Sequence, residues 1–398
     1  MLTSLAFIFL VGLFFAWICE KIRLPRIIGM LLAGILLGPY VLNCLDSSIL
    51  LISSDLRKLA LLIILIKAGL SLDLNDLKKV GRPAVMMACV PATCEIIGFI
   101  LFAPKLLNIS MVDAAVMGAV LGAVSPAVVV PRMVRLMEEG YGTEKSIPQM
   151  VLAGASCDDI YVIVLFSTFV NMAKGGKFEA MDLIQIPSSI VFGVLLGAVF
   201  GFMMHTLFKK VQMENSMKVI LILAISFFLV SIENWMESIV SISSLLAVVS
   251  MACVIKKKSE KEVSSDLSLK FGKLWLAAEV LLFVLVGAAV DIRYTMEAGV
   301  VAVLMIFIGL FFRCIGVCLC TFKTHLNMKE RLFCIIAYLP KATVQAAIGS
   351  VPLSMGLSCG EIVLSISVLA ILITAPLGAI GMDCTYKKFL VHNRNMVE

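Results

Sequence analysis

The sequence predicts an all-α polytopic membrane protein with 13 transmembrane helices. Of its 398 residues, 61% are hydrophobic and only 15% are charged, whereas about a quarter of the residues in soluble domains are charged. The mean hydropathy is +1.06. The apolar residues fall into successive segments that are each roughly long enough to cross a bilayer. Little of the chain is left for a soluble domain, so we attribute the net charge of +6 to membrane topology and not to nucleic-acid binding.

Thirteen such segments follow one another along the chain. The first lacks a positively charged N-terminal region and a small-residue cleavage site, so we expect a retained helix and not a signal peptide. In order, the predicted helices lie at about 3–19, 26–42, 56–72, 84–104, 111–137, 147–171, 184–208, 217–233, 237–255, 272–291, 295–320, 329–354 and 361–382.

The Lys and Arg residues of the connecting loops predict how the chain crosses the cell membrane. If the N-terminus is outside, the cytoplasmic loops contain 24 of the 33 Lys and Arg residues, the outer loops contain 6, and 3 lie inside the spans. Cytoplasmic loops are normally the ones enriched in these residues. We therefore expect an outside N-terminus and a cytoplasmic C-terminus, with the polar stretch at 256–273 as a solvated cytoplasmic linker.

The two halves of the chain resemble each other. A glycine followed four residues later by an aspartate ends the third predicted helix, at 69–73, and the tenth, at 287–291. The same offset of 218 residues relates Glu95 to Arg313. Because the third and tenth helices cross in opposite directions, we predict an inverted repeat, which is a common transporter construction. The predicted parts are a first six-helix repeat at 1–183, a connector helix at 184–216, a second six-helix repeat at 217–383 and a short cytoplasmic tail at 384–398.

Two predicted helices, one in each half, are interrupted by proline. The fifth contains Pro126 and Pro131, and the twelfth contains Pro340. Proline removes a backbone donor and clashes with the preceding turn. Unwound backbone at bilayer depth is tolerated only where it lines a cavity or is buried in protein. Matching interruptions in two halves therefore point to a binding site, with a pair of ordinary proline kinks as the alternative.

Two adjacent carboxylates, Asp158 and Asp159, lie near the middle of the sixth predicted helix. An ionised carboxylate is costly at that depth, so such residues are by default ion sites or proton relays. As neighbours they should titrate as a coupled pair, and desolvation and mutual repulsion both favour protonation. A bound cation relieves the same repulsion, so we expect cation and protons to compete for one site.

Three motifs resemble those of the NHA-type sodium/proton antiporters of the cation/proton antiporter superfamily. They are Gly122-Ala-Val-Ser-Pro-Ala-Val-Val-Val-Pro131, Asp158-Asp159-Ile160 and Leu339-Pro-Lys-Ala-Thr-Val-Gln-Ala-Ala-Ile-Gly349, and the resemblance covers nearly the whole chain. It implies an NhaA-like antiporter fold, in which two broken helices cross near the membrane midplane, and a homodimer with a mobile ion-carrying core. It also implies a transporter and not an enzyme, which exchanges Na+ or Li+ for protons by elevator-type alternating access and needs no cofactor.

By the same resemblance, Asp158 and Asp159 match the family's ion-binding carboxylates, with Asp159 as the direct ligand and Asp158 as its partner. Hard cations prefer oxygen ligands. Ser156 shares a helix face with Asp159, and Ser125 lies at the predicted break, so both are candidate ligands together with freed backbone carbonyls and water. Either serine can instead bond to its own backbone, which is the commoner fate of serine in apolar helices.

A buried ion pair is predicted between Glu95 and Arg313. Many relatives carry a lysine in the helix that holds Arg313 here, whereas the NHA type pairs an arginine with a glutamate. Removing one partner would leave the other charge buried and unpaired, so we expect a structural pair. The alternative is that Arg313 leaves Glu95 and pairs with Asp158 when sodium departs. We expect Lys341 to compensate the partial negative charge of helix ends at the crossing. Both aspartates would then be free to exchange protons, which predicts electrogenic exchange.

Three other functions fit parts of this pattern. A K+/H+ antiporter on the same fold would use the same oxygen ligands, and the sequence does not separate sodium from potassium. A passive cation channel would not need protonatable ligands. An intramembrane aspartyl protease needs two carboxylates that face each other from separate helices, whereas neighbours on one helix are about 100° apart, so we discount it.

Overall fold

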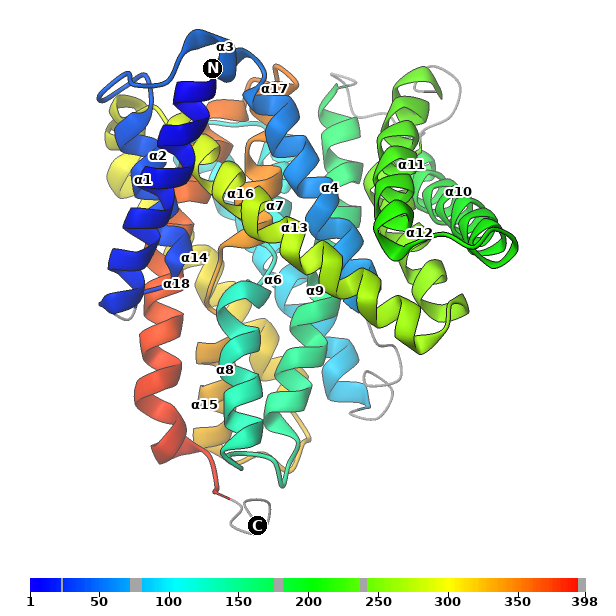
Figure 1. The fold of residues 1–398 in the computed structure, drawn as a ribbon. Helices are drawn as coiled ribbons and strands as arrows, with labels where there is room; N and C mark the ends of the chain where they lie inside the picture. The colour runs from blue at the N-terminus through cyan, green and yellow to red at the C-terminus, as the bar shows by residue number, and fades with distance from the viewer. Residues whose placement is uncertain (23, 72–80, 175–181, 237–241, 393–398) are drawn as a thin grey trace. The chain divides into compact units, whose positions relative to one another are not determined.

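The computed structural model describes residues 1–22, 24–71, 81–174, 182–236 and 242–392, and the regular elements within these ranges are helices (Figure 1). In chain order they are α1 (Leu2–Lys21), α2 (Arg26–Leu37), α3 (Ser47–Leu51), α4 (Ser53–Ser71), α6 (Arg82–Leu107), α7 (Met111–Leu121), α8 (Pro126–Glu138), α9 (Ile147–Lys174), α10 (Asp182–Lys210), α11 (Asn215–Met236), α12 (Ser244–Lys258), α13 (Lys261–Ala288), α14 (Ile292–Thr321), α15 (Met328–Ala337), α16 (Thr343–Gly349), α17 (Val351–Ser354) and α18 (Gly360–Phe389).

The lengths and compositions of the helices support the prediction of a polytopic membrane protein. Each predicted segment contains at least one helix. In the described part of the chain, 9 helices are long and apolar enough to cross a membrane, with α7 and α8 counted as one. The other predicted segments hold helices that are shorter, as in α2, or carry more charge, as in α4. The number of 13 spans and the inverted repeat stay predictions, and Asp73 of the first repeat motif lies outside the described residues.

The polar stretch at 256–273, predicted as a solvated cytoplasmic linker, is mostly helical, and its place relative to the membrane stays a prediction. Helix α12 continues through Lys258 and α13 begins at Lys261, so the stretch is almost entirely helical. Its lysines and serines are polar but compatible with a helix. Helix α13 therefore begins about eleven residues earlier than the predicted span, which was placed by hydropathy alone.

The chain forms two compact units that interleave along the sequence. One consists of Met1–Ser54, Asp73–Val162 and Phe283–Glu398, and the other of Asp55–Leu72 and Ile163–Leu282. In the second unit, α10 and α12 run parallel with very close backbones. A Cβ atom at Gly197 would lie 2.1 Å from the carbonyl oxygen of Ala247, and one at Gly201 would lie 2.8 Å from that of Met251. Glycine at spacing four allows this approach, as in other membrane helix pairs.

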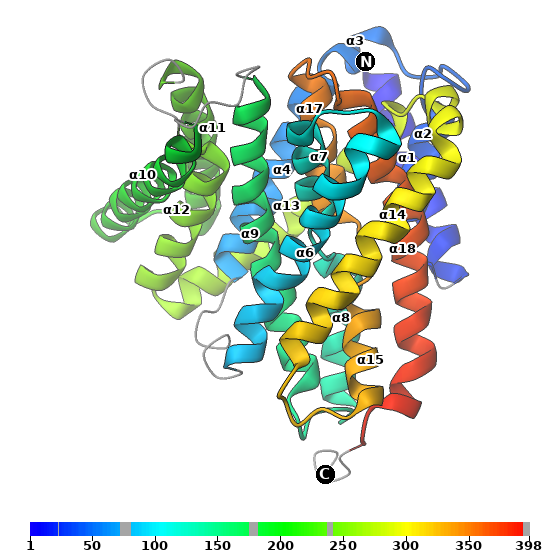
Figure 2. The ribbon, with the colours of Figure 1, turned by 180° about the vertical axis from the view of Figure 1, so that it is seen from behind.

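In the first unit, α6 and α14 form a tightly packed pair that lies side by side in Figure 2. Gly316 of α14 faces Pro91 of α6, and a Cβ atom at 316 would lie 2.6 Å from the α-carbon of Pro91. This close approach brings the middles of the two helices together. It positions Glu95 of α6 against Arg313 of α14.

Two helices of the first unit are broken at the predicted places. Helix α7 ends at Leu121 and α8 begins at Pro126, which occupies the first helical position, where no backbone donor is needed. Helix α15 ends at Ala337 and α16 begins at Thr343, with Pro340 in the gap. Residues 122–125 and 338–342 are thus unwound and free to bond to other groups.

Candidate functional site

The two helix breaks bind each other. The N–H of Ser125 donates to the carbonyl oxygen of Pro340 at 2.7 Å. The side-chain amide of Gln345 donates to the carbonyl of Ala123 at 2.8 Å, and its oxygen accepts from the N–H of Ala342 at 2.8 Å. Gln345 therefore holds the two breaks together, a role that the sequence alone did not indicate.

Asp158 is fully buried beside the α7–α8 break, on helix α9. Its Oδ2 atom accepts a hydrogen bond from the N–H of Val124 at 2.7 Å and lies 3.9 Å from a guanidinium nitrogen of Arg313. Its other oxygen, Oδ1, is buried without a hydrogen-bond partner among the described residues. One oxygen is thus fixed by the break and the other is left for a ligand.

Asp159 and Ser125 add further unpartnered oxygens. Asp159 is 8% exposed and Ser125 is fully buried, and neither Asp159 Oδ1 nor Ser125 Oγ has a hydrogen-bond partner in the described part of the chain. The side chain of Ser156 lies outside the described residues. The described residues form no group of three or more His, Cys, Asp or Glu side chains that could hold a metal ion. These unpartnered oxygens are hard ligands of the kind that alkali and alkaline-earth cations prefer.

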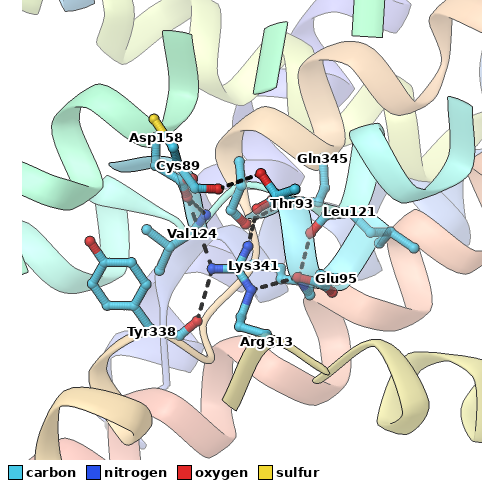
Figure 3. Close-up of polar contacts among 12 residues, drawn as sticks. Cys89, Thr93, Glu95, Leu121, Val124, Asp158, Arg313, Tyr338, Lys341 and Gln345 are labelled. Carbon is cyan, nitrogen blue, oxygen red and sulfur yellow. Dashed lines mark hydrogen bonds and ion pairs between the residues drawn. The ribbon is translucent and has the colours of Figure 1, made fainter. Parts of the chain in front are cut away.

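Glu95 forms ion pairs with two cationic side chains and not with Arg313 alone (Figure 3). Its Oε2 atom lies 2.5 Å from Nε of Arg313, and its Oε1 atom lies 2.6 Å from Nζ of Lys341. All three side chains are buried. The repeat offset correctly indicated the pairing of Glu95 with Arg313. It gave no signal for Lys341, which is far away in sequence and has no counterpart in the first half.

Arg313 and Lys341 also bind the carbonyls that the breaks expose. Arg313 donates to the carbonyls of Gly122 and Tyr338, the latter at 3.3 Å. Lys341 donates to the carbonyl of Leu121, the last residue of α7. Positive side chains at a helix C-terminus offset its partial negative charge. This geometry matches the expected position of Lys341, although its contact with Glu95 is equally close.

Five ionisable groups therefore lie at or next to the two helix breaks. The carboxylates of Glu95 and Asp158 contact the cationic side chains of Arg313 and Lys341, and Asp159 directly follows Asp158 on α9. When all five are ionised, the cluster carries one excess negative charge. Burying such a charge is costly, so a bound cation or a proton stabilises the cluster.

Comparison with known proteins identifies the family. The family model described as "Sodium/hydrogen exchanger, transmembrane" matches residues 5–384. The chain belongs to this family. It is a sodium/proton antiporter of the cation/proton antiporter superfamily, a transporter and not an enzyme, as its motifs predicted.

Individual relatives agree with this assignment. The antiporter is 36% identical to human sodium/hydrogen exchanger 9B2 over 371 residues, which cover 90% of this chain and 68% of that protein. It is 31% identical to human sodium/hydrogen exchanger 9B1, over 93% of this chain and 73% of that protein. The sodium proton antiporter MjNhaP1 from Methanocaldococcus jannaschii superposes with a TM-score of 0.82 over 98% of both chains. At 20% identity, that match shows a shared fold.

Proposed function

We propose that the antiporter exchanges Na+ or Li+ for protons at Asp158 and Asp159, with Ser125 and Ser156 as further cation ligands. The observation that carries this proposal is the pair of adjacent buried carboxylates whose Oδ1 atoms lack partners, beside two helix breaks that bind each other. No separate proton path is required, because the cation and the proton neutralise the same excess charge.

Competition for one site, combined with alternating access, is sufficient for antiport. A state loaded with the cation and a state loaded with protons are both stabilised, whereas the empty state retains a buried charge. The transporter then changes its accessible side only when loaded. We assign the structural ion pair to Glu95 and Arg313, and charge compensation at the crossing to Lys341.

Movement of the site is proposed to follow an elevator mechanism. In support, every described residue of the site belongs to one compact unit, so its geometry can be kept during a movement of that unit. The protein would act as a homodimer in the cell membrane, with an outside N-terminus and a cytoplasmic C-terminus. If both aspartates exchange their protons, two protons move per cation and exchange is electrogenic.

The test is a proteoliposome assay with a trapped pH dye and pulses of Na+, Li+ or K+, with and without a clamped membrane potential. We expect Na+ and Li+ to drive proton flux, and clamping the potential to raise the rate if exchange is electrogenic. A response to K+ instead would indicate a K+/H+ antiporter, and current without proton coupling would indicate a channel.

Two variants test the site in the same assay. We expect Asp159→Asn to abolish exchange and Asp158→Asn to reduce it strongly. Asp55→Asn, at an exposed carboxylate in the first turn of α4, is the matched control and should leave exchange unchanged. Full sodium-driven proton flux in Asp159→Asn would overturn the proposal.

A further inference from the structure

Tyr338 carries a buried hydroxyl that has no partner among the described residues. The residue caps the end of α15, directly before the helix break, and its side chain is fully buried. Its backbone is held firmly, because its N–H bonds to the carbonyl of Ile335 at 3.0 Å and its carbonyl accepts from Arg313. A buried hydroxyl without a hydrogen-bond partner is unfavourable, so the presence of the Tyr338 hydroxyl at this place needs an explanation.

Gly154 makes room for this hydroxyl. A Cβ atom at position 154 would lie 2.1 Å from the Tyr338 hydroxyl oxygen and 3.4 Å from the ring carbon that bears it. The first distance is shorter than any real contact, whereas the second is an ordinary one. The phenol oxygen thus occupies the space that a side chain at 154 would need. The ring lies directly against the helix that carries the aspartates.

The hydroxyl faces Gly154, which lies one helical turn before Asp158 on α9. Residues four apart share a helix face, with about 5–6 Å between their Cβ atoms, and Gly154 is four residues before Asp158. In Figure 3, Tyr338 and Asp158 lie on the side of the cluster that is opposite Glu95. One water molecule, with two hydrogen bonds of about 2.8 Å each, bridges oxygens about 5–6 Å apart, which is similar to the spacing of side chains one helical turn apart.

We propose that Tyr338 is a positioning residue of the cation site, whose hydroxyl accepts a hydrogen bond from a water molecule that completes the coordination of the cation at Asp158 and Asp159. This inference rests on the proposed function of that site. The hydroxyl, the Oδ1 atoms of both aspartates and Ser125 Oγ are all buried oxygens without a hydrogen-bond partner among the described residues, and we infer that they line one site. A hard cation keeps part of its water shell in such a site, and Tyr338 orients that water.

The test is Tyr338→Phe, which keeps the ring and removes only the oxygen. We expect the apparent KM for Na+ to rise about fivefold, the factor for the loss of one hydrogen bond, while the maximal rate stays unchanged. Tyr40→Phe removes an exposed tyrosine hydroxyl and serves as the control with an unchanged KM.

A second variant approaches the same hydroxyl from its other side. Gly154→Ala inserts a Cβ atom where the oxygen lies and should raise the KM for Na+ in the wild-type background. In the Tyr338→Phe background, Gly154→Ala should raise the KM for Na+ less, because the new Cβ atom no longer meets the tyrosine oxygen, which is one of its two close contacts. The other, to Cβ of Met87 at 2.8 Å, remains. If Tyr338→Phe does not accumulate, the effect of Gly154→Ala on KM decides the question.

The outcomes separate this inference from the proposed function. An unchanged KM in Tyr338→Phe, or a fall in maximal rate alone, would overturn the role of Tyr338 while wild-type exchange still supports antiport. Absence of exchange in the wild type would overturn the proposed function itself. Na+ should also raise the melting temperature of the wild-type protein more than that of Tyr338→Phe, which measures cation binding without turnover.

Discussion

A charge swap between Glu95 and Arg313 tests whether these two residues form a closed pair. If they did, Glu95→Arg combined with Arg313→Glu would restore the attraction. Lys341 changes this expectation, because its Nζ atom lies 2.6 Å from the Glu95 carboxylate. The swap would put a second positive group beside Lys341. It would also put a carboxylate near Asp158, whose Oδ2 is 3.9 Å from Arg313.

The magnitude follows from Coulomb's law. Two unit charges 4 Å apart interact by about 4 kcal/mol at an effective dielectric constant of about 20. The swap turns the attraction between positions 95 and 341 into a repulsion of similar size, and it adds a repulsion between carboxylates at positions 313 and 158. A total change of several kcal/mol is comparable to the whole stability of a typical domain, roughly 5–15 kcal/mol.

We therefore expect the double swap variant to accumulate poorly and to melt on the order of 10 °C below the wild type. Accumulation and melting are measured by size-exclusion chromatography in detergent. Adding Lys341→Met to the swap removes the new repulsion between cations and should restore part of the loss. A double swap variant that accumulates and melts like the wild type would refute the three-residue arrangement.

Three further predictions concern the crossing and the competition. Gln345→Leu leaves the carbonyl of Ala123 and the N–H of Ala342 unpaired, which costs about 1–3 kcal/mol for each group; we expect a lower melting temperature and slower exchange. Gly316→Ala forces α6 and α14 apart and should destabilise the protein by about 1–3 kcal/mol, measured by melting, and an unchanged value would contradict the close contact with Pro91. Acidic pH should raise the apparent KM for Na+, because protons occupy the carboxylates. In the acidic limit, the rise is about tenfold per pH unit if one proton competes and about a hundredfold if two do, and a KM independent of pH would exclude competition.

The sequence predicted those parts of the site that local chemistry marks. Prolines near residues 126 and 340 predicted the helix breaks, because a proline cannot complete a helical ladder. Asp158 and Asp159 stood out because carboxylates are costly in an apolar helix. Long-range contacts were less accessible. The side chain of Gln345 joins two helix breaks that are over two hundred residues apart in sequence. Nothing in the local sequence around Gln345 distinguishes it from an ordinary polar residue.

Lys341 shows why the remaining contacts were missed. Its place in a break predicted an interaction with helix ends, which matches its bond to the carbonyl of Leu121. Its contact with Glu95 depends on how the crossing packs against α6, and the sequence does not contain that geometry in any local form. The helical structure of the stretch at 256–273 was missed for a different reason, because hydropathy reports burial in lipid and not whether a polar segment is helical.

Several backbone carbonyls at the two helix breaks accept hydrogen bonds from other residues of the chain. This bears on how cation binding is coupled to protons. Those of Leu121, Gly122 and Ala123 accept from Lys341, Arg313 and Gln345. Those of Tyr338 and Pro340 accept from Arg313 and from the backbone of Ser125. In the proposed site, the cation would therefore bind mainly side-chain oxygens and water, and the strongest of these oxygens belong to the carboxylates. Carbonyl oxygens would bind a cation without taking up a proton, whereas carboxylates bind one or the other. The internal use of the carbonyls thus supports the proposal that the cation and protons compete for the same carboxylates.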